Sequence, residues 1–428
     1  MLKAALQNLG CSKNLVDGDR IIYSLKTAGF EITEDFSEAE IIVVNTCSFI
    51  REAQEEAIES ILDCASYKNG GKCATLIVSG CFSERYRKEV ADKFPEVDLW
   101  VGVNDWEHIF KEKFSTKVKK PFERKLDEPI ASQYLKIAEG CSHGCTFCVI
   151  PSIRGKFVSR PDTDIIEEAQ WLYENGTKEL ILVAQDSSFY GRDTNSTLQK
   201  LLEKLLAKTQ FPWIRVMYLH PKYVDKSLLS LFANESRLCS YFDIPLQHIS
   251  DPVLKAMNRP TTGKDIHALL DNIRSIVPDA AIRSAFILGF PGETEKDFME
   301  LQRFVEHARF DKLGVFPYSA EEGTKAFGMR PRPKAATATR RCEELMLIQR
   351  DISRELMEAK VGKTIDVIID RVAEDPDFNY EARSRHDAPE VDGKVLITEG
   401  NADIGTIIPV QIIGCGDYDL YGKVIRKP

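Results

Sequence analysis

The sequence predicts a multidomain α/β protein with a doubly wound N-terminal α/β domain, a central partial (β/α)6 TIM-like barrel and a C-terminal all-β, OB-like barrel. Apolar runs of strand length alternate with amphipathic helical segments over most of the chain. Six such runs start between residues 134 and 312, about 36 residues apart, which is the spacing of βα units. A closed TIM barrel has eight such units, so six predict a partial barrel. Beyond residue 361, alternating strands and turns replace the helices.

The composition is that of an ordinary globular protein. Of the 428 residues, 43% are hydrophobic and 29% are charged, which excludes collagen, coiled coil and disorder. A net charge of −9 makes the chain a poor non-specific binder of nucleic acid, although it does not exclude a local basic patch. No apolar run approaches the roughly 18 residues of a membrane span, and the N-terminus is too polar for a signal peptide. We therefore expect a cytoplasmic monomer without membrane contact.

In the first domain, expected over residues 1–120, three cysteines occupy equivalent places. Apolar strands are expected at 2–11, 40–47, 75–81 and 98–102, with helices around 14–28, 51–68, 83–94 and 105–114. Cys11, Cys47 and Cys81 each close one of the first three strands. Because ligands of parallel sheets bind beyond the carboxyl ends of the strands, these three thiols are expected on one rim. The bland alternative is that they are ordinary buried cysteines.

A charged, proline-containing linker is expected at 115–130, followed by the central domain over 127–357. Its strands are expected at 134–141, 179–186, 214–220, 241–247, 282–291 and 312–319, and helices at 162–175, 197–208, 225–233, 263–276 and 294–308. Active sites of such barrels lie at the carboxyl ends of the strands. The sequence places Cys141, Gln185, Asp186, His220, Gln247, His248, Gly289, Gly292 and Tyr318 there.

A proline-rich hinge at 329–335 and a polar helix at about 336–360 lead to the third domain, expected over 360–428. Residues 361–428 contain eight basic and thirteen acidic residues, a net charge of −5. A barrel that follows an RNA backbone should be basic. The acidity instead favours a basic protein partner, against the alternative of an ordinary solubilising surface.

The strongest motif is Cys141-Ser-His-Gly-Cys145-Thr-Phe-Cys148. Three thiolates on a loop after a strand can bind three irons of a [4Fe–4S] cluster and leave the fourth open. A structural zinc site is the alternative, but it needs four ligands, and His143 is poorly placed inside the loop to be the fourth. The other cysteines are interpreted as structural: Cys64, Cys73, Cys239, Cys342 and Cys415.

This cysteine spacing after the first strand of a partial barrel resembles the radical S-adenosylmethionine (SAM) superfamily. With a three-cysteine domain before it and a β barrel of the TRAM kind after it, the whole chain resembles the radical SAM methylthiotransferases. Segments such as LGCSKNLVDGD, NTCSFI, SGCFSERY and DIPLQHISDPVLKAMNRP resemble the branch that modifies an aspartate of the twelfth small-subunit ribosomal protein. Gly18 stands where that branch usually has Ser. The alternative is the branch that modifies isopentenyl-adenosine in tRNA.

The resemblance implies two [4Fe–4S] clusters and SAM as cofactors. Cys141, Cys145 and Cys148 would hold the cluster that cleaves SAM to a 5′-deoxyadenosyl radical, which abstracts hydrogen from an unactivated carbon. Cys11, Cys47 and Cys81 match the ligands of a second cluster, where methylated sulfur is held for transfer. The partners implied are the basic ribosomal protein as substrate, a sulfur donor and an electron donor.

Residues for SAM itself are expected around the same rim. Gly289 and Gly292, in the segment FILGFPGE, allow backbone approach to adenosine, and Phe147 offers backbone contacts to adenine. Gln185, Gln247 and Arg283 could hold ribose or carboxylate groups. Arg154 and Arg160 could fix the charge of substrate or SAM, although surface arginines are usually solvated.

A non-catalytic zinc or iron–sulfur scaffold that binds nucleic acid is the alternative from a different class. Six cysteines in two domains argue against it. The sequence has no Walker motif and no complete dinucleotide-binding fingerprint. It therefore excludes an ATPase and an enzyme that transfers hydride.

Overall fold

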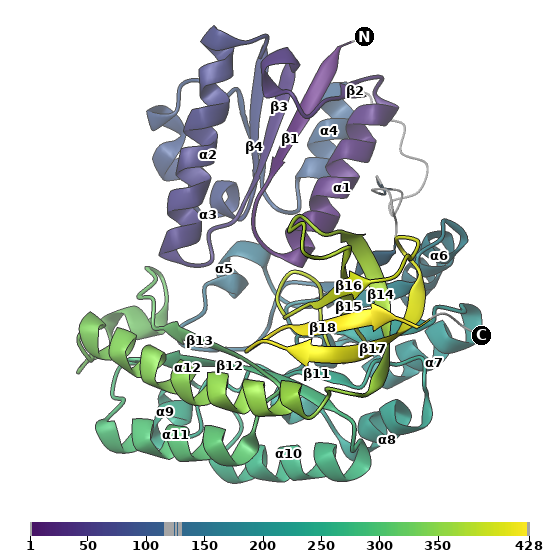
Figure 1. Cartoon of the computed structure of the whole chain (residues 1–428). Coiled ribbons are helices and arrows are strands. Elements are labelled where there is room, and N and C mark those ends of the chain that lie inside the picture. The colour runs from purple at the N-terminus through teal and green to yellow at the C-terminus, as the bar shows by residue number, and fades with distance from the viewer. Residues whose placement is uncertain (1, 115–123, 125, 127–130, 426–428) are drawn as a thin grey trace.

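The computed structural model describes residues 2–114, 124, 126 and 131–425. The linker expected at 115–130 therefore lies outside the described residues except at positions 124 and 126. Figure 1 shows the N-terminal domain at one end of the molecule, the central barrel at the other and the C-terminal barrel beside the central one. The predicted fold class is confirmed in all three parts.

The N-terminal domain is a five-stranded parallel sheet in the order β2-β1-β3-β4-β5. Its strands are β1 (Lys3–Asn8), β2 (Glu31–Ile32), β3 (Ile41–Thr46), β4 (Thr75–Gly80) and β5 (Leu99–Trp100). The central strand β3, IIVVNT, is buried along its whole length, as expected of a parallel strand covered on both faces. The short edge strand β2 was not predicted, because two residues carry no periodicity.

Helices cover both faces of this sheet (Figure 1). Side chains of α1 (Ser12–Thr27) and α4 (Trp106–Phe114) pack with Val43 on one face, and those of α2 (Arg51–Gly70) and α3 (Cys81–Val90) pack with Val44 on the other. This is the doubly wound arrangement that the sequence predicts. It leaves the carboxyl ends of β1, β3 and β4 on one rim.

The central barrel has six parallel strands in the order β6-β9-β10-β11-β12-β13. They are β6 (Ser132–Lys136), β9 (Glu179–Val183), β10 (Trp213–Val216), β11 (Tyr241–Asp243), β12 (Ala281–Leu288) and β13 (Lys312–Pro317). The strands form two three-stranded sheets, β10-β9-β6 and β11-β12-β13, which are joined by a bridge between Ile214 and Leu238 and by a hydrogen bond of 2.7 Å from the N–H of Leu219 to the carbonyl of Asp243. Within the described residues β6 and β13 do not pair with each other, so the barrel is open, as predicted.

Helices on the outside of the barrel bury its main apolar core. They are α6 (Asp162–Glu174), α7 (Leu198–Lys208), α8 (Lys226–Asn234), α10 (Gly263–Ile276), α11 (Glu295–Ala308) and the long α12 (Ala335–Glu358). Shorter elements surround the cysteine motif: β7 (Ala138–Glu139), α5 (Ile150–Arg154), β8 (Val158–Ser159) and α9 (Asp251–Ala256). The helix ends lie within a few residues of their predicted positions.

The C-terminal part is a closed barrel in the order β14-β15-β16-β18-β17. Its strands are β14 (Thr364–Val372), β15 (Tyr380–Ser384), β16 (Val395–Glu399), β17 (Ile407–Cys415) and β18 (Leu420–Val424). Closure removes the unpaired edges that an isolated small sheet would present.

The C-terminal barrel contacts the central barrel at the start of its strands. Arg383 forms an ion pair of 2.9 Å with Glu179, the first residue of β9, and the hydroxyl of Tyr241, the first residue of β11, donates to Asp392 at 2.7 Å. Lys312, which begins β13, pairs with Asp387 at 2.6 Å. The cysteine motif lies at the opposite ends of the strands. No helix in the described ranges is both long and apolar enough to cross a membrane.

Candidate functional site

The three N-terminal cysteines lie on the rim that the sequence predicts. Cys11 precedes α1, Cys47 follows β3, and Cys81 is the first residue of α3 after β4. Gly10 shows how closely two of these loops approach: a Cβ at this position would lie 2.8 Å from the Cβ of Cys47, and its φ of +95° suits glycine. The sheet topology therefore brings Cys11 and Cys47 into one site although 35 residues separate them.

Two positive charges act on these thiols. Burial raises the pKa of Cys11, but Lys13 and Arg154 outweigh it, so the Cys11 pKa lies below its ordinary value. Burial raises the pKa of Cys81 to about 11, against the opposing effect of Arg154, and burial also raises that of Cys47. Arg154 thus offsets part of the cost of holding thiolates in this buried site.

Arg154 comes from the central domain, six residues after Cys148, and its side chain is only 1% exposed. Its guanidinium donates to Oδ1 of Asn14 at 2.6 Å and to Glu139 at 3.0 and 3.1 Å. The pKa of Arg154 is raised well above its ordinary value because Cys81, Glu139 and other anionic groups outweigh burial. From the sequence, the alternative for Arg154 was a solvated surface arginine. The structure instead buries its side chain.

The second group of cysteines forms a loop between β7 and α5. The backbone N–H of Cys148 donates to the carbonyl of Cys145 at 3.3 Å, which turns the loop back on itself. Residues after α9 support it from outside: Asn258 donates to the carbonyl of Gly144 at 2.8 Å, and Nη1 of Arg259 lies 3.7 Å from Sγ of Cys145. Arg259 is a site residue that the sequence analysis missed.

The pKa values of this second group also reflect burial. Burial raises the pKa of Cys141 to about 11 and that of Cys148 to about 12, while backbone N–H groups and Arg259 act in the opposite direction. Cys145 adds a like charge that raises both values further. Bound metal ions would relieve this repulsion, because they stabilise the thiolate form.

His143 does not point at a fourth ligand position. Its Nε2 atom lies 2.6 Å from Oδ2 of Asp186, and its ring stacks on His220 with centroids 4.5 Å apart. This matches the expectation that the ring is poorly placed beside all three thiols. A four-ligand zinc site at this loop therefore gains no support from His143.

The end of β12 lies against the cysteine loop, as the sequence predicts. The ring of Phe147 meets that of Phe290 edge-on at 6.4 Å, and Phe290 meets Tyr318 at 5.2 Å. Gly289, one residue before Phe290, has φ +77°, and a Cβ there would lie 2.5 Å from that of Ala338. Contact with α12 thus adds a structural reason for glycine at 289, whereas Gly292 (φ +88°) faces open space.

The two predicted glutamines both lie at the rim. The side-chain oxygen and nitrogen of Gln185 are buried, and among the described residues neither has a hydrogen-bond partner. Gln247 has an unusual positive φ of 73°, held by backbone hydrogen bonds of 2.8 and 2.9 Å to β12. Residues strained in this way concentrate at functional sites. An unsatisfied buried amide is costly unless a ligand completes its hydrogen bonds.

Arg283 lies near the start of β12, away from these rim residues. It pairs with Asp243 at 3.0 Å and with Asp392 of the C-terminal barrel at 3.4 Å. Arg160, the other arginine considered, pairs with Glu168 at 2.8 Å. Both guanidinium groups therefore already have carboxylate partners.

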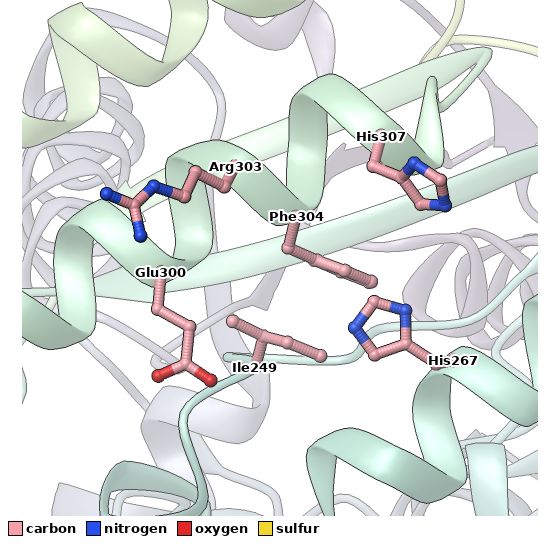
Figure 2. Close-up of a pocket in the computed structure, with 6 residues that line it drawn as sticks. All are labelled: Ile249, His267, Glu300, Arg303, Phe304 and His307. Atoms are coloured by element: carbon pink, nitrogen blue, oxygen red, sulfur yellow. The ribbon is translucent and has the colours of Figure 1, made fainter.

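A separate pocket lies between α10 and α11 on the outside of the barrel (Figure 2). Its lining contains no predicted site residue: Ile249, His267, Glu300, Arg303, Phe304 and His307. It does not belong to the cysteine sites.

The donor sets suit clusters better than single ions. In the described part of the chain no three His, Cys, Asp or Glu side chains converge closely enough to hold one metal ion. An iron–sulfur cube presents its irons at separate corners, so each thiolate binds its own iron and the thiols need not meet. Two sets of three thiols and the unsatisfied amide of Gln185 therefore fit two clusters and an additional polar ligand.

The fold and the cysteine sites define a radical SAM protein with two flanking domains. The model of the radical SAM superfamily matches residues 135–305, the uncharacterized protein family UPF0004 matches residues 3–102, and the TRAM domain matches residues 361–425. Solved structures agree on the fold: the radical SAM methyltransferase TsrM from Kitasatospora setae aligns at a TM-score of 0.55 and 14% identity, covering 85% of this chain and 77% of TsrM. The cobalamin-dependent SAM radical enzyme OxsB aligns at a TM-score of 0.52 and 13% identity, covering 80% of this chain and 56% of OxsB.

Curated relatives define the family more narrowly. The ribosomal protein uS12 methylthiotransferase RimO of Pelobacter propionicus is 43% identical, over 99% of this chain and 98% of its own. The RimO protein of Clostridioides difficile is 42% identical to this chain, with 100% of both chains covered. That of Aquifex aeolicus is 44% identical, over 99% of this chain and 97% of its own. The chain belongs to the RimO family of radical SAM methylthiotransferases.

Proposed function

We propose that this chain is a methylthiotransferase that attaches a methylthio group to the β-carbon of an aspartate in ribosomal protein uS12. The full-length similarity to RimO proteins supports the reaction and the substrate. The observation that carries the proposal is the pair of three-cysteine sites joined by Arg154, which follows one set in sequence and contacts the other in space.

We assign one [4Fe–4S] cluster to Cys141, Cys145 and Cys148 and a second to Cys11, Cys47 and Cys81. SAM would lie at the rim lined by Phe147, Gln185, Gln247, Gly289 and Gly292, with Arg283 further down the barrel. When bound, these groups supply a carbon radical and a transferable sulfur, chemistry that no side chain provides. The corresponding domains are 1–120, 127–357 and 360–428.

The chain's own residues would bind and orient the cofactors and shield them from water. Arg259 brings a positive charge to within 3.7 Å of the Cys145 sulfur and would offset part of the negative charge of a cluster bound there. Phe147, Phe290 and Tyr318 form an apolar wall beside the loop, which excludes water from a site of radical chemistry. The free amide of Gln185 offers both a donor and an acceptor to a polar ligand.

Charge supports a protein rather than an RNA substrate. The acidic C-terminal barrel suits a basic ribosomal protein and repels a phosphate backbone. Between β14 and β15, Glu374, Asp375 and Asp377 are exposed. Asp387, in contrast, is 4% exposed and paired with Lys312, so it is not part of any docking surface.

We further propose that the protein is a cytoplasmic monomer that receives electrons and sulfur from separate donor proteins. The test of the function is an anaerobic reaction of the reconstituted protein with SAM, a reductant and either uS12 or unmodified tRNA. We expect mass analysis to find one methylthio group on an aspartate of uS12 and none on the tRNA. Modification of isopentenyl-adenosine instead would assign the chain to the tRNA-modifying branch.

A further inference from the structure

Lys13 places a buried positive charge between the N-terminal cysteines and the mouth of the central barrel. It lies two residues after Cys11 in the first turn of α1, and the residue is 8% exposed. Its ammonium nitrogen lies 3.5 Å from the carbonyl oxygen of Ala184, just after β9, and 4.0 Å from the centroid of the Tyr218 ring, just after β10. One side chain of the N-terminal domain thus reaches two strand ends of the barrel.

This ammonium has few partners for a buried cation. No carboxylate among the described residues lies within 4.0 Å of it. The buried Lys136, by contrast, pairs with Asp17 at 2.6 Å and Glu139 at 2.8 Å. An ammonium carries three N–H donors, and burying it without an anion costs free energy. Lys13 thus offers a charge that no carboxylate among the described residues pairs with directly.

The surroundings of Lys13 are held firmly. Tyr218 adopts a positive φ of 61°, which is unusual for a bulky residue. Its backbone N–H donates to Asp243 at 3.1 Å, and its carbonyl accepts from Ser187 at 2.9 Å. These bonds maintain the strained backbone and keep the ring face against the ammonium. Such strain persists where the surrounding structure over-determines it, commonly at ligand sites.

We propose that Lys13 is a positioning residue that binds the sulfur anion, sulfide or methanethiolate, brought to the Cys11–Cys47–Cys81 site and holds it toward the barrel mouth. This inference rests on the proposed second cluster. The aromatic face and the carbonyl beside the ammonium offer an anion no hydrogen-bond donors, so a weakly hydrated sulfur anion would lose less hydration here than a strongly hydrated carboxylate.

The test uses the whole protein, reconstituted anaerobically with iron and sulfide, and the variant Lys13→Met. Each is titrated with sodium sulfide and with methanethiolate, and binding is followed by the electron paramagnetic resonance and visible spectra of the clusters. Lys13→Met should bind at least one anion about tenfold or more weakly, the loss expected for a charged hydrogen bond. Lys13→Arg should retain most of the affinity. The exposed Lys156→Met is the matched control and should behave as the parent.

The iron content of Lys13→Met should equal that of the parent protein, and its thermal unfolding should not occur at a lower temperature, because the variant no longer buries an unpaired charge. Wild-type affinity of Lys13→Met for both anions would overturn the proposal. So would loss of iron or of the folded state in both Lys13→Met and Lys13→Gln, which would make Lys13 structural. Weaker binding of uS12 with unchanged anion affinity would likewise overturn it, in favour of a carboxylate ligand. A parent protein that binds the anions through Lys13 but never modifies uS12 would contradict the proposed function alone.

Discussion

Nη2 of Arg154 donates a hydrogen bond of 2.6 Å to Oδ1 of Asn14, across the contact between the central barrel and the N-terminal domain. Arg154 ends the short helix that follows the barrel's cysteine loop, and Asn14 lies in the first turn after Cys11. A single buried guanidinium thereby fixes one three-cysteine site relative to the other. Reactions that pass a group between two cofactors depend on such fixed geometry.

Replacing Arg154 with Gln should therefore destabilise the protein strongly. It removes one of the two cationic partners of the Glu139 carboxylate, which is 19% exposed and keeps Lys136, a change that costs about 1–3 kcal/mol. Urea unfolding of the reconstituted protein measures this cost. Arg51→Gln removes an arginine that is 78% exposed and should change stability by less than about 1 kcal/mol. Equal stability of the two variants would contradict the structural role of Arg154.

Neutralising the exposed acidic segment of the C-terminal barrel should weaken binding of uS12. The variant replaces Glu374, Asp375 and Asp377 with Gln or Asn, and binding is measured over a range of salt concentrations. We expect lower affinity at low salt and a flatter salt dependence, because electrostatic attraction is screened by salt. The control removes the same charge from α2 at the exposed Glu52, Glu56 and Glu59. If both variants bind alike, the acidity serves only solubility.

The buried His248 leads us to predict a specific pH dependence of the free energy of unfolding. The residue is fully buried, its Nδ1 accepts from the backbone N–H of Ser250 at 3.0 Å, and burial lowers its pKa to about 4, although Asp297 acts in the opposite direction. The unfolded pKa is about 6.5, so the folded state favours the neutral ring. The stability that this ring contributes is complete above pH 6.5 and is lost as the pH falls toward 4, by up to about 3 kcal/mol.

His248→Asn keeps an acceptor for the Ser250 N–H but removes the titration. Free energies of unfolding measured between pH 7 and 4 should fall less steeply in this variant than in the parent. His108→Asn, whose side chain is 75% exposed in the parent, should leave the slope unchanged. An unaltered slope in His248→Asn would show that His248 does not titrate in this range.

The periodic parts of the fold were predictable because they are local. A buried run such as IIVVNT and the spacing of Cys141, Cys145 and Cys148 are visible in one stretch of sequence. The rim position of Cys11, Cys47 and Cys81 followed from the rule that parallel strands end on one side. The two-residue strand β2 escaped because it has too few residues for a pattern.

The roles of single charged residues were not predictable in the same way. Arg154 and Asn14 are 140 residues apart, and nothing near either residue reveals that they meet. The same holds for Lys13 against Ala184 and for Arg259 against Cys145. Asp387 is one of the thirteen acidic residues counted in the C-terminal barrel, yet it pairs with Lys312 inside the domain contact. Burial of a charge depends on how domains pack, and composition does not encode that packing locally.

We propose that each three-cysteine site holds its own cluster. Anaerobic iron quantitation of the reconstituted protein tests it most directly, with one variant lacking Cys141, Cys145 and Cys148 and another lacking Cys11, Cys47 and Cys81. We predict about eight irons for the parent and about four for each variant, with SAM cleavage abolished only in the first. Full iron content in the variant that lacks Cys11, Cys47 and Cys81 would contradict the second site.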